Sequence, residues 1–233
     1  MPTATEPRHP VVELRQYTLH PNHRDALIDL FDREFMETQE AVGMTVLCQF
    51  RDLDDPDRFV WLRGFHGMAA RADALGAFYG GPAWEAHCDA ANATMIDSDN
   101  VLLLRPASPN TPMPIDTWRR GTPPAGTAVA VVYPLAAAPD ARFVAAFLQD
   151  WLPPLARHSG TLAGCWVSEN SANTFPRLPV REGEQVLVAL ARFDAREDGD
   201  RFAAALKASH GGLERLGTPS QVLRLAPTAR SRF

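Results

Sequence analysis

The chain has few cysteines, and none of them is placed to bind a metal. Cys48, Cys88 and Cys165 are the three cysteines among 233 residues, and no two of them form a CxxC pair. An odd number of scattered cysteines argues against both a disulfide framework and a cysteine zinc site. We therefore expect reduced thiols that pack as small core residues.

The sequence also lacks clusters of basic residues and long apolar runs. Its formal net charge is -5, with 45% hydrophobic and 22% charged residues, which is typical of an ordinary globular protein. Binding to nucleic-acid phosphates needs concentrated Lys and Arg, and a membrane-spanning helix needs about 18 apolar residues in a row. The N-terminal MPTATEPRHP lacks the basic start and apolar core of a secretory signal. We expect a cytoplasmic protein with no nucleic-acid partner and no membrane span.

Several catalytic signatures are missing. The sequence contains no GxGxxG, P-loop, HExxH or GxSxG motif, so dinucleotide, nucleotide-triphosphate, zincin and serine-hydrolase functions have no support. His20 and His23 are three residues apart, but they straddle an expected helix start and are predicted to point to solvent. Nothing in the sequence places His158 or His210 as an axial haem ligand. We therefore expect no metal and no cofactor.

Hydrophobic periodicity in the first half predicts the order β-α-β-β-α-β, the ferredoxin-like arrangement. In that arrangement both helices cover one face of an antiparallel sheet. The helix after the third strand is interrupted by Gly80-Gly81-Pro82 and then resumes. The expected strands are 11–19, 44–50, 59–65 and 101–105, and the expected helices run from about 23 to 39 and from 68 to beyond 87.

The second half repeats this order. Its expected strands are 128–135, 161–167, 184–193 and 221–225, with a helix that begins at Pro139 and Asp140 and a shorter one around Phe202. The halves align through Gly43 to Cys48 with Gly160 to Cys165, and Tyr17 lies near Tyr133. Two such sheets bury their free faces against each other. We predict an α+β fold in which two tandem ferredoxin-like repeats form a pseudo-dimeric α+β barrel.

The same pattern divides the chain into segments. We expect a disordered leader, a first repeat, a proline-rich linker, a diverged second repeat and a short tail. Their bounds are 1–9, 10–106, 107–126, 127–227 and 228–233.

Charged and aromatic side chains alternate along the first and third strands. If Val12 and Leu14 face the helices, the side chains of Glu13, Arg15 and Tyr17 share the opposite face. The same parity places Trp61, Arg63 and Phe65 together on the neighbouring strand. This set predicts either a site in which an arginine holds a carboxylate or enolate oxygen beside aromatic walls, or a buried ion-pair network that only pins the barrel.

Two further features are open to a functional or a structural interpretation. Tyr79 and Trp84 flank the Gly-Gly-Pro break, which either opens a pocket between helix and sheet or forms a packing corner. His66 and His87 serve as general bases if they line a pocket, and otherwise are solvated or bonded to the backbone.

Three stretches resemble the NIPSNAP family, a branch of the dimeric α+β barrel group. They are VVELRQYTL, DRFVWLRGF and ALGAFYGGPAWEAHCDAANATMIDSDNVLLLRP, which together cover Val11 to Pro106. The resemblance implies the barrel fold. It implies no single activity, because the wider group includes cofactor-independent monooxygenases, isomerases and haem enzymes.

The hypothesis that follows is binding of a small apolar or aromatic carbonyl or carboxylate compound in a pocket of the first repeat. The alternatives are a cofactor-independent enzyme of monooxygenase or isomerase type, and a purely structural or interaction protein. A homodimer is compatible with the internal pairing of the repeats, because exposed sheet edges and helix faces remain. The candidate ligand-binding residues are Glu13, Arg15, Tyr17, Trp61, Arg63, Phe65, Tyr79 and Trp84; the candidate catalytic residues are Arg63, His66, His87 and Tyr17.

Overall fold

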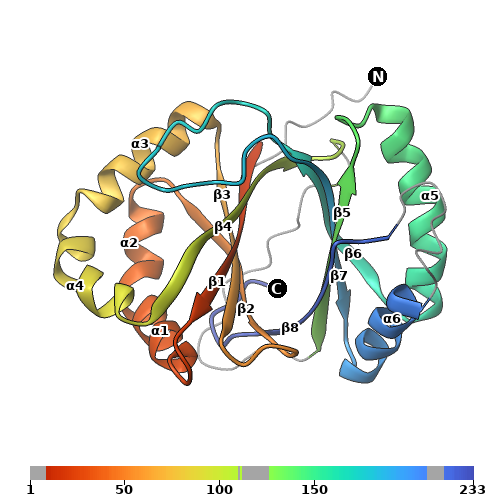
Figure 1. Cartoon of the computed structure of the whole chain (residues 1–233), viewed down its shortest axis with the longest axis horizontal. Coiled ribbons are helices and arrows are strands. Elements are labelled where there is room, and N and C mark those ends of the chain that lie inside the picture. Colours follow the sequence, from red (N-terminus) through yellow and green to blue (C-terminus); the bar gives the residue numbers. More distant parts are fainter. Residues whose placement is uncertain (1–8, 110, 112–125, 209–217) are drawn as a thin grey trace.

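A closed antiparallel barrel forms the centre of the molecule (Figure 1). The computed structural model describes residues 9–109, 111, 126–208 and 218–233. In this part of the chain the strands follow one another around the barrel in the order β1-β3-β2-β8-β5-β7-β6-β4. Helices pack outside the barrel on two opposite sides, one set from each half of the chain (Figure 1).

The first repeat has the predicted ferredoxin-like order. Its strands lie side by side as β4-β1-β3-β2, and its helices cover the outer face of this half of the barrel. The helix after β1 contains one π-helical segment, Phe31–Phe35, between two α-helical parts. The elements are β1 Val11–Leu19, α1 Arg24–Leu30, α2 Met36–Ala41, β2 Thr45–Asp52, β3 Arg58–Phe65, α3 Met68–Tyr79, α4 Pro82–Asn92 and β4 Met95–Pro106.

The second repeat has the same topology, with the strand order β8-β5-β7-β6. Pairing of β2 with β8 and of β4 with β6 closes the barrel between the halves. The predicted fold class, two tandem ferredoxin-like repeats that form a pseudo-dimeric α+β barrel, is therefore confirmed. The elements are β5 Thr127–Leu135, α5 Ala141–Arg157, β6 Thr161–Ser168, β7 Gln185–Phe193, α6 Arg196–Ala208 and β8 Gln221–Pro227.

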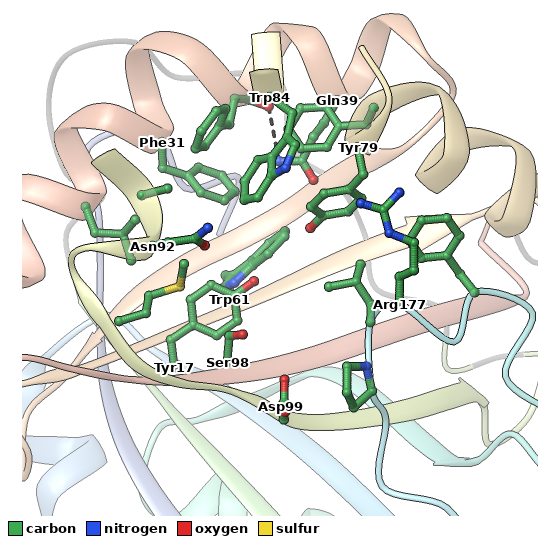
Figure 2. Close-up of a pocket in the computed structure, with 18 residues that line it drawn as sticks. Tyr17, Phe31, Gln39, Trp61, Tyr79, Trp84, Asn92, Ser98, Asp99 and Arg177 are labelled. Carbon is green, nitrogen blue, oxygen red and sulfur yellow. Dashed lines mark hydrogen bonds between the residues drawn. The ribbon is translucent and has the colours of Figure 1, made fainter. Parts of the chain in front are cut away.

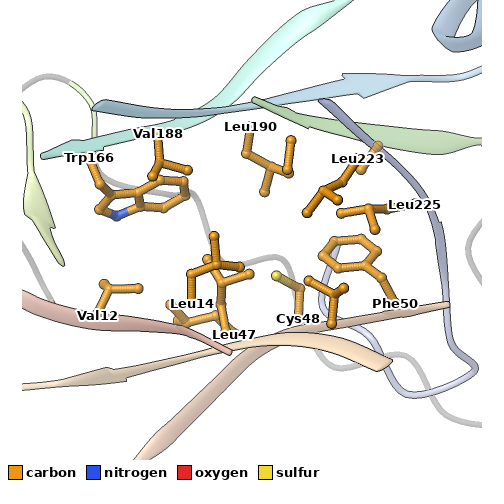
Figure 3. Close-up of a cluster of buried hydrophobic side chains, with 14 of the residues drawn as sticks. Val12, Leu14, Leu47, Cys48, Phe50, Trp166, Val188, Leu190, Leu223 and Leu225 are labelled. Carbon is orange, nitrogen blue, oxygen red and sulfur yellow. The ribbon is translucent and has the colours of Figure 1, made fainter. Parts of the chain in front are cut away.

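The barrel interior is filled by apolar side chains from both repeats (Figure 3). Val12 and Leu14 point into this interior, so the expectation that they face the helices is wrong. Strand β1 is buried on both faces. Because the interior of a small barrel is closed to water, the purely apolar face of β1 points into the barrel. The side chains of Glu13, Arg15 and Tyr17 consequently lie between the sheet and the helices.

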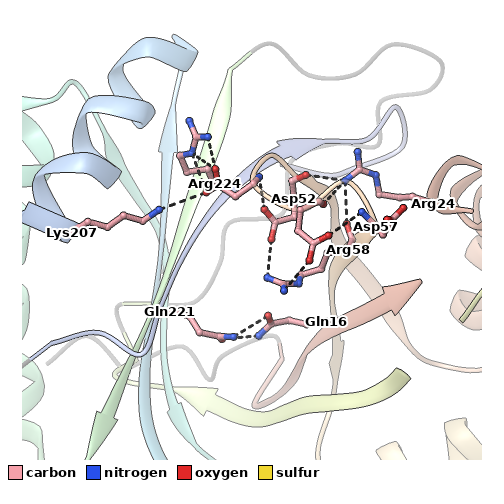
Figure 4. Close-up of polar contacts among 10 residues, drawn as sticks. Gln16, Arg24, Asp52, Asp57, Arg58, Lys207, Gln221 and Arg224 are labelled. Atoms are coloured by element: carbon pink, nitrogen blue, oxygen red, sulfur yellow. Dashed lines mark hydrogen bonds and ion pairs between the residues drawn. The ribbon is translucent and has the colours of Figure 1, made fainter. Parts of the chain in front are cut away.

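Polar contacts tie the two repeats together at one side of the barrel (Figure 4). Gln16 and Gln221 exchange side-chain hydrogen bonds of 2.9 and 3.3 Å. The guanidinium of Arg224 donates to the carboxylate of Asp54, with 3.1 Å between Nε and Oδ1, and the ammonium of Lys207 lies 3.7 Å from the same carboxylate.

The last six residues pack back onto the first repeat. The ring of Phe233 enters the barrel interior and meets Phe50 edge to face at 5.0 Å between centroids. The backbone amide of Gln49 donates to the hydroxyl of Ser231 at 3.0 Å. Most of the expected proline-rich linker, nearly all of the expected leader, and His210 lie outside the described residues.

Within the described ranges, every helix falls short of the length and apolar character that crossing a membrane demands.

Candidate functional site

One buried carboxylate sits among three buried guanidinium groups on the helix-facing side of the first repeat. Glu13 Oε2 lies 2.8 Å from Arg15 Nη1 and 2.7 Å from Arg63 Nε, and Glu13 Oε1 lies 2.6 Å from Arg71 Nε. All four side chains are fully buried. We call this set, Glu13, Arg15, Arg63 and Arg71, the arginine cluster.

The elements bring the cluster together by simple geometry. Glu13 on β1 lies directly opposite Arg63 on β3, and neighbours of this kind share one face of the sheet. Arg71 comes from α3, where Ala74, Leu75 and Phe78 are buried on the same face. Their spacing of three, four and seven residues places Arg71 on the apolar side of the helix, over the sheet.

The cluster carries more positive charge than its acid neutralises. Among the described residues, Glu13 is the only acid that forms an ion pair with these arginines, so two positive charges remain. Neutral acceptors take part of the remaining hydrogen bonds: Gln39 Oε1 accepts from Arg63 Nη1 at 3.1 Å, and Tyr17 Oη accepts from Arg15 Nε at 3.1 Å. Within the described part of the chain, Nη2 of Arg63 and Nη2 of Arg71 have no hydrogen-bond partner.

The protonation states follow from these contacts. Burial alone would raise the pKa of Glu13, but Arg63, Arg15 and Arg71 outweigh it and hold that pKa far below its usual range. Burial lowers the pKa of the Arg71 guanidinium, with Glu13 opposing the shift. Arginine titrates so far above neutral pH that it stays charged. At neutral pH the cluster is therefore one anion with three cations.

An aromatic cavity of about 310 Å³ lies between the sheet and the helices of the first repeat (Figure 2). Tyr17 and Trp61 project into it from β1 and β3, and the helices contribute further rings, including those of Phe31, Tyr79 and Trp84. The volume lies at the lower end of the range for small-molecule sites. The full lining is Tyr17, Leu27, Phe31, Phe35, Gln39, Trp61, Phe78, Tyr79, Trp84, Ala91, Asn92, Met95, Ser98, Asp99, Phe175, Arg177, Leu178 and Pro179.

Two buried side chains that carry hydrogen-bond donors, those of Tyr17 and Trp61, belong to the wall of this cavity. The phenol of Tyr17 already accepts a hydrogen bond from Arg15, so its own proton is directed elsewhere. Burial raises the pKa of Tyr17, against the opposing effect of Arg15, and the phenol stays protonated at neutral pH. The indole Nε1 of Trp61, a residue only 1% exposed, has no partner within the described residues. Such a pair of donors suits a ligand oxygen.

The arginine cluster is present in only one of the two repeats. Leu14 lies opposite Leu62 in the first repeat, and Ala130 lies opposite Leu190 at the equivalent point of the second. We align the two repeats on these two pairs and count the same number of residues along each strand and into the following helix. The residues equivalent to Glu13, Arg15, Arg63 and Arg71 are then Val129, Val131, Ala191 and Gly199. The second repeat therefore builds the same topology with small apolar residues at all four places.

The structure brings together some of the candidates predicted from the sequence. Tyr17, Trp61, Tyr79 and Trp84 line the cavity. The remaining ligand-binding candidates lie in a layer behind its wall: Glu13, Arg15 and Arg63 form the cluster, and Phe65 packs with its ring centroid 5.5 Å from Arg63 Cζ.

Neither histidine proposed as a general base lines the cavity. His66 is exposed at the end of β3, with its ring 5.7 Å from that of His9. His87 lies on α4 and places Nε2 3.3 Å from the carboxylate of Glu34. Of the four catalytic candidates, Tyr17 alone reaches the cavity.

Sequence reasoning missed several residues of the site. Arg71 could have been found from the sequence, because its helical spacing places it on the same apolar helix face as Ala74, Leu75 and Phe78. The residues contributed by the second repeat, Phe175 to Pro179, had no local signal of this kind. They reach the cavity through a long connection whose path depends on the closed barrel.

A barrel of two ferredoxin-like halves, with a cavity between sheet and helices, places the protein in the dimeric α+β barrel class. Residues 12–109 match the NIPSNAP family model, so the first repeat is similar to that family.

Some solved structures resemble the whole chain in fold, and others align with only part of it. A protein from Lactobacillus acidophilus NCFM, provisionally assigned as a monooxygenase, superposes with a TM-score of 0.53 at 12% identity, covering 96% of this chain and 98% of its own. A second provisionally assigned monooxygenase, from Fusobacterium nucleatum, gives 0.53 at 8% identity over 97% and 93%. A NIPSNAP domain protein from Burkholderia xenovorans aligns over 42% of this chain and 95% of its own, with 16% identity and a TM-score of 0.39. No curated protein sequence is significantly similar to the chain.

Proposed function

We propose that the protein binds a small apolar or aromatic compound that carries a carbonyl or carboxylate oxygen, in the cavity of the first repeat. The aromatic lining suits the apolar body of such a compound. The Tyr17 hydroxyl and the Trp61 indole supply donors for its oxygen, and the arginine cluster supplies a positive field behind them.

The observation that carries this proposal is the difference between the repeats. A buried ion network is costly to desolvate, and apolar residues of similar size often serve stability as well or better. The second repeat shows the apolar solution in the same topology, with Val129 and Val131 where the first has Glu13 and Arg15. Since the fold does not require the cluster, we attribute it to the neighbouring cavity.

The charge balance supports an anionic or strongly polarised oxygen. Two uncompensated cations raise the electrostatic potential around Arg15, and the hydrogen bond from Arg15 to Tyr17 brings that potential to the cavity wall. In surroundings of low polarity, a charge is felt over a longer distance than in water. A carboxylate or enolate is therefore favoured over a neutral group of equal size.

A matched pair of probes tests the proposal. 2-Naphthoate and 2-naphthylmethanol share an aromatic body and differ in charge, and their binding is measured by calorimetry at neutral pH. We expect 2-naphthoate to bind more tightly by roughly tenfold, the equivalent of about 1.4 kcal/mol. Equal affinity for the two probes, or no binding of either, would contradict the proposal.

Tyr17→Phe has a matched control in the second repeat. Tyr133 occupies the equivalent place on β5, and burial raises the pKa of its phenol to about 12. We expect Tyr17→Phe to weaken 2-naphthoate binding by roughly tenfold, because a hydrogen bond to a charged acceptor contributes about 1.5 kcal/mol or more. Tyr133→Phe is expected to leave the affinity unchanged; an equal loss in both variants would show that the effect is structural.

A cofactor-independent enzyme is the second candidate, and the placement of Tyr17 favours it. A protonated phenol held by Arg15 can stabilise a developing enolate oxygen in the cavity. The full-length fold similarity to provisionally assigned monooxygenases suggests oxidation of an enolisable aromatic ketone by dioxygen. Oxygen uptake with anthrone as the probe, compared between the native protein and Tyr17→Phe, tests this second candidate.

The cytoplasmic location, the homodimer and the absence of a nucleic-acid partner stay predictions.

A further inference from the structure

The two repeats differ strongly in one connection. In the first repeat, residues 53–57 join β2 to β3 by a short turn. At the equivalent place in the second repeat, residues 169–184 join β6 to β7. Figure 1 shows this longer connection crossing from the second repeat over the barrel to α3 of the first. We call it the 169–184 segment.

The ends of the 169–184 segment are fixed to the barrel. The backbone amide of Glu169 donates to the carbonyl of Leu103 at 2.9 Å, and that of Arg181 donates to the carbonyl of Val101 at 2.8 Å. Both acceptors belong to β4 of the first repeat. The segment is thus anchored beside the cavity at two points.

The tip of the segment is held by α3. Arg71 Nη1 donates to Asn173 Oδ1 at 3.0 Å and to Thr174 Oγ1 at 3.2 Å. The hydroxyl of Thr174 lies 3.2 Å from the carbonyl oxygen of Met68, to which it donates. Arg71, a member of the arginine cluster, therefore contacts both Glu13 and the tip of the segment.

The same tip completes the wall of the cavity. The ring of Phe175 stacks on Tyr79 with 5.9 Å between centroids and 28° between planes. Arg177, Leu178 and Pro179 follow it in the lining, and Arg177 lies beside the Tyr79 side of the cavity in Figure 2. Arg177 is exposed, so its charge lies at the rim of the cavity rather than in its interior.

We propose that the 169–184 segment of the second repeat is the specificity element of the first repeat's cavity, with Phe175 covering the ligand and Arg177 favouring an anionic one. This inference rests on the proposed binding function. At the four described positions that correspond to the arginine cluster, the second repeat has apolar residues, and it contributes instead to the site of the first repeat. Release of a covered ligand requires the tip to leave α3, so Phe175 controls the lifetime of the complex.

Stopped-flow measurements of tryptophan fluorescence with 2-naphthoate and 2-naphthylmethanol test the inference. We expect Phe175→Ala to speed release of both probes by roughly tenfold, because an aromatic cover contributes about 1 kcal/mol or more. Arg177→Gln is expected to weaken 2-naphthoate binding by roughly threefold, as is usual for an exposed charge, and to leave the neutral probe unaffected. The control is Glu182→Gln, an exposed position of the same segment outside the cavity lining, where no change is expected.

Hydrogen exchange of the native protein provides a second measurement that depends on no variant. Saturating 2-naphthoate should slow amide exchange in residues 171–178 and leave residues 53–57 unchanged. If the native protein binds the probe but residues 171–178 exchange as before and both cavity variants behave like Glu182→Gln, the inference is overturned while the proposed function stands. If the native protein binds neither probe, the proposed function fails and the inference falls with it.

Discussion

At the residue scale, the unusual feature is an acid that must neutralise several buried cations. Glu13 contacts three guanidinium groups at 2.6 to 2.8 Å, and every member is buried. Removing one partner from such a network leaves the others uncompensated in a medium of low polarity. Glu13 is therefore the side chain whose loss should cost the first repeat most.

We predict that Glu13→Gln lowers the free energy of unfolding by about 3 to 5 kcal/mol at neutral pH, because three buried cations lose their counter-ion. Urea denaturation followed by tryptophan fluorescence measures this loss. Glu182→Gln, an exposed substitution of the same type, is expected to change stability by less than about 0.5 kcal/mol.

The loss of stability caused by Glu13→Gln should become smaller as the pH falls. The pKa of Glu13 in the folded protein lies below the 4.5 of an unperturbed glutamate, so its stabilising effect is complete above that value. Below it, the unfolded chain takes up a proton that the folded chain does not. The stability difference between native protein and Glu13→Gln should therefore shrink by about 1.4 kcal/mol per pH unit as the pH falls. A difference that stays constant down to pH 3 would contradict the placement of Glu13.

At the element scale, the positions of the strands and helices were predictable from periodicity. The first helix after the Gly67 turn, Met68–Tyr79, and the strand Val11–Leu19 have the predicted bounds. Strand β4 begins earlier than expected, at Met95, because the polar stretch before Val101 pairs with β1 through irregular register. Such a polar stretch has no alternating pattern to reveal it.

The face that each strand presents to the barrel was not predictable in the same way. Alternation shows which residues share a face, and Glu13, Arg15 and Tyr17 do share one. It does not show which face is inside when β1 is buried on both sides. The repeat alignment had a related error: Cys48 pairs with Leu62, and it is Gly164, rather than Cys165, that pairs with the equivalent Leu190.

The cap of α5 gives a test that is independent of the cavity. Asp140 Oδ1 accepts a hydrogen bond from the backbone amide of Phe143 at 2.8 Å, as the sequence suggested for this helix start. We predict that Asp140→Ala lowers the free energy of unfolding by about 1 kcal/mol, because the first turn loses its cap. Thermal and urea unfolding measure the loss. A change in probe affinity alongside it would argue that the second repeat's helices contribute to the site.

At the scale of the whole molecule, the two repeats have the same architecture and different interiors. Between sheet and helices, the second repeat packs Phe147, Trp151 and Phe202 in an apolar core. The first repeat has a cavity and the arginine cluster in the corresponding layer. The sequence predicted a pocket in the first repeat, with Trp61 and Arg63 among its candidate residues. The path of the 169–184 segment could not be predicted, because it depends on the closed barrel.

The central claim is that the arginine cluster serves ligand binding rather than folding. The most direct measurement replaces the whole cluster by apolar side chains of similar size, Glu13→Leu with Arg15→Met, Arg63→Met and Arg71→Met. We predict a folded protein whose free energy of unfolding equals or exceeds the native value, and whose preference for 2-naphthoate over 2-naphthylmethanol is lost. A variant that fails to fold, or one that folds and keeps the native preference, would contradict it.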